Sequence, residues 1–240
     1  MEPVFEREYY LRAADFDWCS CITPAAALDL FQDVAGIHAN ELGCGTVVHD
    51  GQRLVWVLVK SKLQMLGDVK MYDKVRVKTW PLKPAAIRYQ REYLISAEDG
   101  TPVVKGSSEW VLMHPVLRRV VPVKNAYPEG LEHCTDRSFE GRFTRVPDFE
   151  AEGDGWAVQP RLSDVDLNGH VNNTKYANFV LDALQLDRGE AVDTMQIDYH
   201  REVLSGAALT VYTHREGEEI LAKGVGDDGE VMFICSIQLK

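Results

Sequence analysis

The order of the secondary-structure signals constrains this chain most, because one amphipathic helix followed by about four strands occurs twice within 240 residues. The first helix is predicted over residues 23–43, with Thr23 as the N-cap, Pro24 at the first helical position and Gly43 at the end. The second helix is predicted over residues 173–186. Apolar residues recur at helical spacing in both segments, so each helix has one face to bury.

Almost all of the remaining sequence has the pattern of β-strands. The predicted strands are residues 54–66, 74–80, 87–96 and 102–113 in the first half, and 195–204, 208–216, 219–226 and 231–239 in the second. The turns EDGT and DDGE favour hairpins between neighbouring strands. Each half is therefore predicted to be one helix followed by antiparallel strands.

The middle of the chain, residues 115–140, contains three prolines and Gly130 among mixed charges and has no sustained helical or strand period. Such a segment is typical of a linker. The predicted domains are an N-terminal unit over residues 1–114, the linker over 115–140 and a C-terminal unit over 141–240.

A shift of 149 positions aligns the segment before the first helix with the segment before the second. In this register Asp15 falls on Asp164, Asp17 on Asp166, Cys19 on Asn168 and Cys21 on His170. If the halves are duplicated units, the second carries polar groups where the first carries small thiols. The chemistry is therefore predicted in the second half.

Composition excludes several classes of protein. The 26 Lys and Arg against 37 Asp and Glu give a net charge of −11, which argues against nucleic-acid binding because that depends on clustered positive charge. The longest apolar run, residues 54–59, is far shorter than the ~18 residues that suggest a membrane span. The N-terminus lacks the pattern of a secretory signal, and five cysteines without a CxxC pair fit a reducing compartment. We expect a cytoplasmic protein without integral membrane association.

Residues 164–173, DVDLNGHVNN, place six polar side chains directly before the second helix. One interpretation is a calcium loop, but Lys175 stands where such a loop needs a bidentate Glu. A second interpretation is structural: Asn168 and Gly169 make a turn, and Asn172 or Asn173 caps the helix. The third is a hydrolytic site.

The hydrolytic interpretation depends on the alternation of Asp166, Asn168 and His170. Residues two apart in an extended segment project to the same side, so these three side chains would line one pocket wall. A carboxylate, an amide and an imidazole at a helix N-terminus supply a base, a group that positions water, and N–H donors for an oxyanion. This chemistry requires no metal, and the structural interpretation stays open beside it.

The segment DVDLNGHVNNTKYANFVLDAL resembles the D-x-N-x-H-V-N-N-x-x-Y segment of the acyl-acyl carrier protein (acyl-ACP) thioesterases, double hot-dog enzymes that end fatty-acid synthesis. DLFQDVAGIHANELG, VWVLVKSKLQM, Trp80-Pro81 and SEWVLMHPVLRR resemble segments of that family in the same order. The resemblance covers nearly the whole chain. It implies an α+β fold, a tandem (double) hot-dog in which two antiparallel sheets each wrap a central helix.

The resemblance also implies the catalytic residues. Asp166, Asn168 and His170 match the active-site triplet of the family, and Glu202 in DYHREV matches a further acid. Val203 stands where plant members carry cysteine, so no thiol nucleophile can operate from that position. This departure favours a water-based mechanism. The alternative for Glu202 is an ordinary charge at a strand end.

The implied reaction is hydrolysis of fatty acyl-ACP thioesters to free fatty acid and ACP, with ACP as the protein partner and no cofactor. An alkyl chain needs an apolar cavity, which we expect beside the first helix. The candidate lining residues are Phe31, Val34, Trp56 and Trp110. For each of them the alternative is an ordinary position in the hydrophobic core.

Other activities stay open at this level. An acyl-CoA thioesterase would use the same chemistry, because CoA and ACP present the same phosphopantetheine arm. A hot-dog dehydratase acting on hydroxyacyl thioesters would release no thiol, and a non-catalytic acyl-thioester sensor would bind without turnover. Arg118 and Arg119 form either a solvated pair or part of an ACP-docking surface. A homodimer is an open alternative for the assembly.

Overall fold

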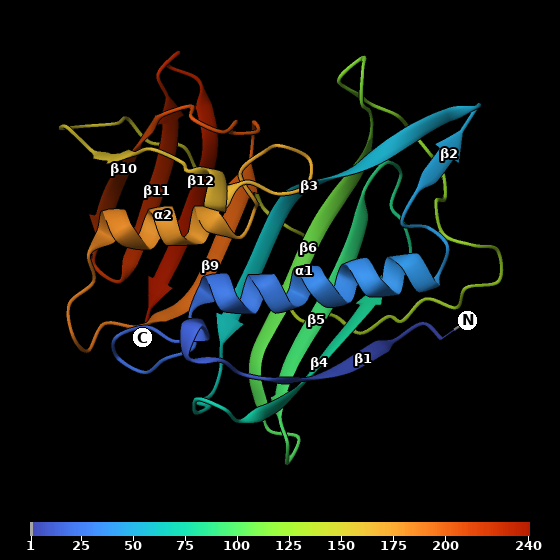
Figure 1. Ribbon diagram of the computed structural model, residues 1–240, viewed down its shortest axis with the longest axis horizontal. Coiled ribbons are helices and arrows are strands. Elements are labelled where there is room, and N and C mark those ends of the chain that lie inside the picture. Colours follow the sequence, from blue (N-terminus) through green and yellow to red (C-terminus); the bar gives the residue numbers. More distant parts are fainter. Residues whose placement is uncertain (1) are drawn as a thin grey trace.

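The computed structural model describes residues 2–240 and shows two helices lying on one side of a large sheet (Figure 1). The elements of the first half are β1 (Phe5–Tyr10), η1 (Ala13–Asp15), α1 (Pro24–Glu41), β2 (Val47–His49), β3 (Gln52–Met65), β4 (Lys74–Pro81), β5 (Tyr89–Ala97), β6 (Pro102–His114) and β7 (Arg119–Val120). Those of the second half are β8 (Trp156–Val158), η2 (Leu162–Asp164), α2 (Lys175–Leu184), β9 (Val192–Tyr199), β10 (Leu209–Glu216), β11 (Glu219–Gly226) and β12 (Val231–Leu239).

The strands of the two halves form one continuous antiparallel sheet. The order β1-β4-β5-β6-β3 in the first half continues as β9-β12-β11-β10-β8 in the second. The halves join where β3 pairs with β9, with Lys60 opposite Asp198 and Ser61 opposite Ile197. The predicted α+β double hot-dog is confirmed, with its two sheets fused edge to edge. The domain boundaries at 114 and 141 stay a prediction.

Helix α1 begins where the sequence predicted, because Thr23 Oγ1 accepts the Ala26 N–H at 3.1 Å. Phe31 fixes the helix on the sheet. Its ring stacks on Tyr93 with centroids 4.6 Å apart, and a Cβ added at Gly106 would lie 2.3 Å from its ring. Glycine at position 106 therefore allows the close approach of α1 to β6.

Several elements differ from the sequence prediction. Helix α2 begins at Lys175, two residues later than predicted. Asn172 Oδ1 accepts the Thr174 N–H at 3.1 Å just before it, so the Asn172 side chain supports the helix start as the structural interpretation expected. The strand predicted over residues 195–204 ends at Tyr199, because the following residues turn to pair with the loop before α2. The edge strands β1 and β8 were not predicted, since short edge strands carry a weak alternating pattern.

The 149-residue register is a structural repeat as well as a sequence match. The turns η1 and η2 lie 149 residues apart and begin after Arg12 and Arg161, whose N–H groups donate to Asp15 and Asp164 at 2.6 and 2.8 Å. The bridges Phe16 to Ile22 and Val165 to Val171 also correspond. The two loops thus share one backbone design.

Residues 121–155 contain no helix or strand, and residues 136–149 among them cross the sheet on the face away from the helices. Tyr93 faces α1, so its neighbour Glu92 faces the other side, where it accepts the Ser138 N–H at 2.8 Å. Farther along, the Val146 N–H donates to Asp198 at 3.1 Å. The stretch 136–149, which we call the strap, covers the buried carboxylates of Glu92 on β5 and of Asp198 at the junction of the halves.

His38 is a buried histidine on the sheet-facing side of α1, with 2% of its surface exposed. Its Nδ1 lies 3.0 Å from Arg91 Nη1, and its Nε2 lies 3.2 Å from the Glu2 carbonyl oxygen. A guanidinium group can only donate, so Nδ1 accepts and the neutral ring carries its proton on Nε2. Burial, and then the Arg91 charge, lower the pKa of His38 to about 4.

We expect acid to destabilise the protein partly through His38. Between pH 6.5 and about 4 the unfolded chain holds a proton on His38 that the folded chain lacks, so the free energy of unfolding falls as the pH falls, by at most about 1.4 kcal/mol per pH unit. Denaturant unfolding at pH 7 and pH 5 measures this. His38→Gln should show a smaller difference between the two pH values than the wild type, and an equal difference would contradict the assignment.

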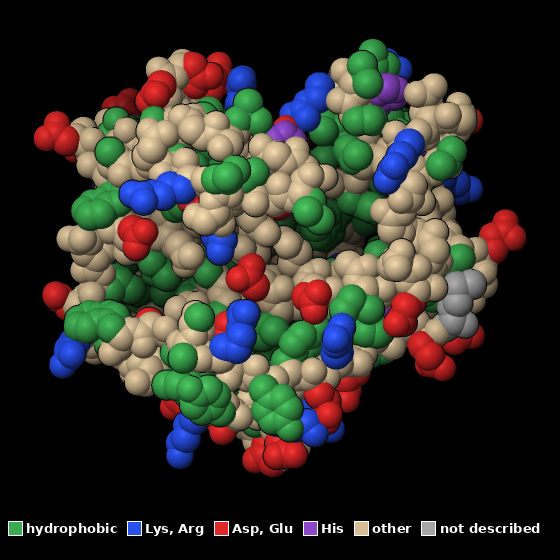
Figure 2. Space-filling model, viewed as in Figure 1, with side chains coloured by type: hydrophobic (Ala, Val, Ile, Leu, Met, Phe, Trp, Pro, Cys, Tyr) green, Lys and Arg blue, Asp and Glu red, His purple; other side chains and the backbone are tan. Residues whose placement is uncertain are grey.

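The face that carries the helices is hollowed beside α1, and hydrophobic side chains are visible inside the hollow (Figure 2).

Within residues 2–240, no helix has the length and apolar character needed to cross a membrane.

Candidate active site

Asp166 organises the loop that carries Asn168 and His170. Its Oδ1 accepts the Asn168 N–H at 2.8 Å and the His170 N–H at 3.4 Å, and its Oδ2 accepts Asn168 Nδ2 at 3.2 Å. Gly169 has φ 81°, a left-handed conformation that favours glycine. The segment is therefore a tight turn and not the extended stretch we expected. The three side chains nevertheless line one hollow of about 510 Å³.

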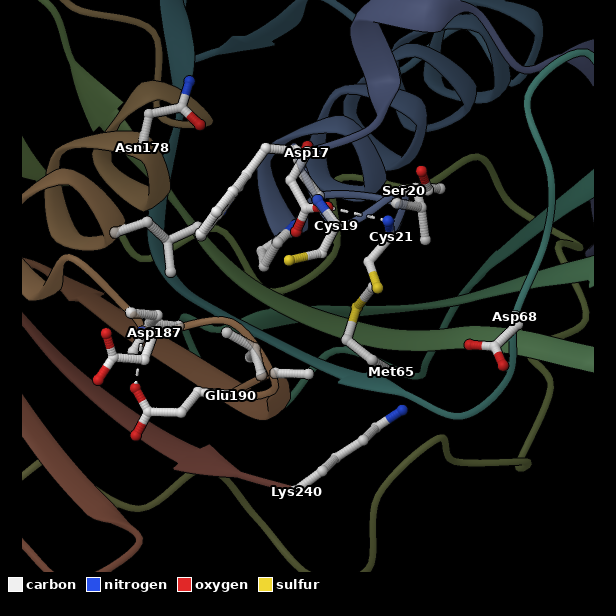
Figure 3. Close-up of a pocket in the computed structure, with 18 of the residues that line it drawn as sticks. Asp17, Cys19, Ser20, Cys21, Met65, Asp68, Asn178, Asp187, Glu190 and Lys240 are labelled. Atoms are coloured by element: carbon white, nitrogen blue, oxygen red, sulfur yellow. Dashed lines mark hydrogen bonds between the residues drawn. The ribbon is translucent and has the colours of Figure 1, made fainter.

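The loop before α1 repeats this turn. Asp17 Oδ1 accepts the Cys19 and Cys21 N–H groups at 2.8 and 2.9 Å. Figure 3 shows these residues at the edge of a separate cavity of about 740 Å³. Burial, and then the Asp17 charge, raise the pKa of Cys21, so its thiol stays protonated and weakly nucleophilic. The aspartate is thus common to both loops, while the amide and imidazole occur in the second only.

Glu202 lies against His170 because the chain after β9 pairs with the loop. His170 bridges to Leu204, and the Val171 N–H donates to the Val203 carbonyl at 2.8 Å. Glu202 Oε2 consequently lies 3.3 Å from His170 Nε2. The structure thus brings together the four residues Asp166, Asn168, His170 and Glu202 around one hollow.

Arg118 is a residue of this hollow that sequence reasoning did not place there. It lies in the turn after β6 with φ 50°, and its Nη2 donates to Glu202 Oε2. Arg119 lies in β7. Both contacts to Glu202, from Arg118 and from His170, reach the same oxygen. Oε1 makes no hydrogen bond to any residue within 2–240 and is free to accept a proton.

Two donors at the start of α2 have no partner among the described residues. They are the Asn173 backbone N–H and the buried Thr174 hydroxyl. Asn173 lines the hollow, whereas the Thr174 hydroxyl is buried beside a small neighbouring cavity. The N-terminus of α2 carries a partial positive charge, so the Asn173 N–H suits a developing anion. In the first half, Asn173 corresponds to Pro24, which has no N–H. The first loop therefore lacks the equivalent donor.

Tyr199 connects this helix start with the sheet, and sequence reasoning missed it too. Its hydroxyl lies 3.0 Å from Ser61 Oγ and donates to the Asn173 carbonyl at 3.2 Å. Burial raises the pKa of Tyr199, so the hydroxyl keeps its proton. Its position in the DYHREV segment was the only available signal.

The aromatic residues predicted to line an acyl pocket separate into two groups. Trp56 and Trp110 line the cavity beside α1, whose volume is about 740 Å³. Trp56 also lines the active-site hollow, and Phe31 lines a small cavity of about 30 Å³ that shares Trp110 with the larger one. Val34 is fully buried in the core cluster and lines neither cavity.

Cys235 lies fully buried in β12, and burial raises its pKa. Val203 is buried as well, with 2% of its surface exposed. Neither position presents a thiolate to the hollow. Within residues 2–240, no three His, Cys, Asp or Glu side chains converge in an arrangement that could hold a metal ion.

Comparison with known families gives matches in both halves. The model described as acyl-ACP thioesterase N-terminal domain matches residues 2–131, and the model described as acyl-ACP thioesterase C-terminal domain matches residues 151–230.

Curated proteins that resemble the chain have low sequence identity to it, but the alignments cover most of its length. An oleoyl-acyl carrier protein thioesterase of Coriandrum sativum is 24% identical over 94% of this chain and 67% of its own length. A palmitoyl-acyl carrier protein thioesterase of Arabidopsis thaliana is 22% identical over 98% of this chain and 61% of its own length. The chain therefore spans about three fifths to two thirds of the length of these relatives, both of which are named as chloroplastic.

Solved structures agree on the fold. An acyl-ACP thioesterase from Bacteroides thetaiotaomicron superposes with a TM-score of 0.84 at 18% identity, covering 99% of this chain and 98% of the other. The 12:0-ACP thioesterase from Umbellularia californica has a TM-score of 0.82 at 18% identity and covers 100% of this chain and 98% of the other.

Proposed function

The chain belongs to the acyl-ACP thioesterase family, and we propose that it hydrolyses fatty acyl-ACP thioesters to a free fatty acid and ACP and so ends fatty-acid synthesis. The observation that carries the mechanism is Glu202, held on Oε2 by His170 and Arg118 with Oε1 free, in the same hollow as the unpartnered Asn173 N–H at the start of α2. A general base and a donor for the oxyanion therefore lie in the same hollow of a single chain.

Glu202 is the proposed general base. Its free Oε1 accepts a proton from a water molecule, whose oxygen attacks the thioester carbonyl carbon. Asp166 was the other candidate. Its carboxylate is already used by the loop N–H groups, as that of Asp17 is in the first half. We therefore assign Asp166 to positioning the loop.

His170 and Asn168 have separate proposed roles, in proton transfer and in positioning the water. After the carbon–sulfur bond breaks, the proton on Glu202 passes through His170 to the leaving sulfur, so the products are a carboxylic acid and the carrier thiol. Asn168 positions the attacking water with its amide. Arg118 orients the Glu202 carboxylate through a charge-assisted hydrogen bond.

The negative charge that develops on the carbonyl oxygen is stabilised at the start of α2. The Asn173 N–H lines the hollow and has no partner among the described residues. Preorganised donors of this kind lower the energy of the tetrahedral intermediate. Pro24 stands at the corresponding position of the first half and has no N–H. The first loop therefore lacks this oxyanion donor, and we assign it no catalytic role.

The acyl chain is proposed to extend from the active-site hollow into the aromatic cavity beside α1. Trp56 lines both spaces, and Trp110 lines the cavity and the small space next to Thr174. Phe31 borders that small space.

We also propose that the protein acts in the cytoplasm, since the five cysteines are free thiols.

Free-thiol release tests the proposed function. Purified protein is given acyl-ACP and acyl-CoA of matched short, medium and long chains, and the liberated thiol is measured. We expect faster turnover of acyl-ACP, and a loss of about 10²-fold or more in His170→Ala. His49→Ala, at a histidine of β2 away from the hollow, is the matched control and should keep its activity.

The other outcomes separate the alternatives. A preference for acyl-CoA would overturn the carrier assignment and keep the site. No thiol release from either substrate would overturn the hydrolase assignment and leave the dehydratase and the acyl-thioester sensor to be compared.

A further inference from the structure

The cavity beside α1 has a polar rim and an aromatic floor. Asp29, Gln32, Asp33 and Asn40 of α1 border its mouth. Its floor consists of buried and half-buried residues from the sheet and from the segments packed on it, namely Cys44, Trp56, Tyr89, Arg91, Trp110 and Tyr127. A charged side chain in such a floor is unusual, because buried arginines are normally paired.

Three aromatic residues of the floor have their polar side-chain atoms hydrogen-bonded inside the protein. Trp56 Nε1 donates to the Cys44 carbonyl at 2.9 Å, and the Tyr89 hydroxyl donates to the Val123 carbonyl at 2.8 Å. Trp110 Nε1 donates to Ser108 Oγ at 2.7 Å. None of these groups is left to recognise a ligand.

Arg91 and Tyr127 are the exceptions. Arg91 is 5% exposed, and only its Nη1 is used, by His38 Nδ1 at 3.0 Å and Thr79 Oγ1 at 3.2 Å. Tyr127 is 8% exposed, and its hydroxyl makes no hydrogen bond to the rest of residues 2–240. Both residues line the same cavity.

The charge of Arg91 has no counter-charge in the described part of the chain. No carboxylate of residues 2–240 forms a salt bridge with it, and its partners His38 and Thr79 are neutral. Asp33, at the rim, accepts the Tyr9 hydroxyl at 2.6 Å. An unpaired buried charge is costly. A guanidinium with free N–H groups matches the geometry of a carboxylate.

We propose that this cavity receives the distal carboxylate of an ω-carboxyacyl group, bound by the Arg91 guanidinium and the Tyr127 hydroxyl. The inference rests on the proposed function, because the acyl group reaches the cavity from a thioester held at Glu202 and His170. The substrate class is thus a dicarboxylic acid esterified at one end to the carrier thiol. The aromatic floor binds the methylene groups between the two ends.

The test compares ω-carboxyacyl-ACP with alkyl acyl-ACP of matched length, across a series of lengths. The quantity measured is the ratio of kcat/KM for the two substrates at each length. Wild type should favour the ω-carboxyacyl substrate at one optimal length. Arg91→Met should lower the ratio there by about 10- to 100-fold, and Tyr127→Phe by a smaller factor, as expected for bonds to a charged group. Arg7→Met, at an exposed arginine of β1, should leave it unchanged.

Free dicarboxylic acids give a second measurement that is independent of turnover. A dicarboxylate of the optimal length should raise the Tm of the wild type more than the monocarboxylate of equal length, and Tyr127→Phe should reduce the difference. A wild-type ratio at or below one at every length would overturn the proposal while the proposed function stands. Thiol release from neither substrate would instead overturn the proposed function, and the thermal shift would still decide whether the cavity binds dicarboxylates.

Discussion

Glu202→Gln should lower kcat/KM for acyl-ACP hydrolysis by about 10²- to 10⁴-fold, which is the usual contribution of a positioned general base. The amide retains the size of the side chain and can still accept from Arg118, but it cannot take a proton from water. The fold should therefore survive, because Glu202 is half-buried at the rim of the hollow and not in the core. Thiol-release kinetics with an unchanged Tm would establish that the loss is chemical.

Asp166→Asn is the matched control for the choice of base. Asn Oδ1 can still accept the loop N–H groups, although the bond from Asn168 Nδ2 becomes a contact between two donors. We expect a smaller loss of kcat/KM than in Glu202→Gln. Asp17→Asn makes the same change in the first loop and should affect stability only. A larger loss in Asp166→Asn than in Glu202→Gln, with the Tm unchanged, would reverse the assignment of the base.

The duplicated order of elements made much of the fold predictable. Hydrophobic periodicity located both helices, and the 149-residue register aligned the two loops from their residue types alone. The register also indicated that the second half differs at Asn168 and His170. It did not show what the shared aspartate does, because a carboxylate that accepts loop N–H groups and one that accepts a proton look alike in sequence.

Contacts between segments distant in sequence were outside the reach of pattern reasoning. Arg118 and Glu202 meet only because β6 ends beside the chain that leaves β9. The end of β9 at Tyr199 likewise depends on the pairing of His170 with Leu204, a tertiary contact that overrides the alternating pattern of residues 195–204. The strap was predicted as a linker only as far as residue 140, and its packing on Glu92 and Asp198 has no local sequence signal.

The junction of the halves contains a buried ion pair whose loss should have the largest effect on stability. Lys60 of β3 and Asp198 of β9 are direct cross-strand partners, and their side chains are 14% and 2% exposed. Asp198 also accepts the Val146 N–H of the strap at 3.1 Å and Gln196 Nε2 at 2.9 Å. One carboxylate thus connects the first half, the strap and the second half.

Asp198→Leu should lower the free energy of unfolding by about 3–5 kcal/mol, because it leaves the Lys60 ammonium buried without its anion. Thermal unfolding measures this as a fall in Tm of about 2–4 °C per kcal/mol for a chain of this size. Glu230→Gln breaks the half-exposed Arg201–Glu230 pair and should cost at most about 1 kcal/mol, since solvent screens such pairs.

The double variant Lys60→Met with Asp198→Leu separates the worth of the pair from the cost of an orphaned charge. Replacing both charges by apolar groups removes the desolvation penalty together with the attraction, so most of the stability lost in Asp198→Leu should return. The Val146 N–H and Gln196 would still lack their acceptor, so recovery should be incomplete. If the double variant is no more stable than Asp198→Leu, the loss comes from the hydrogen bonds to the strap and not from the buried lysine charge.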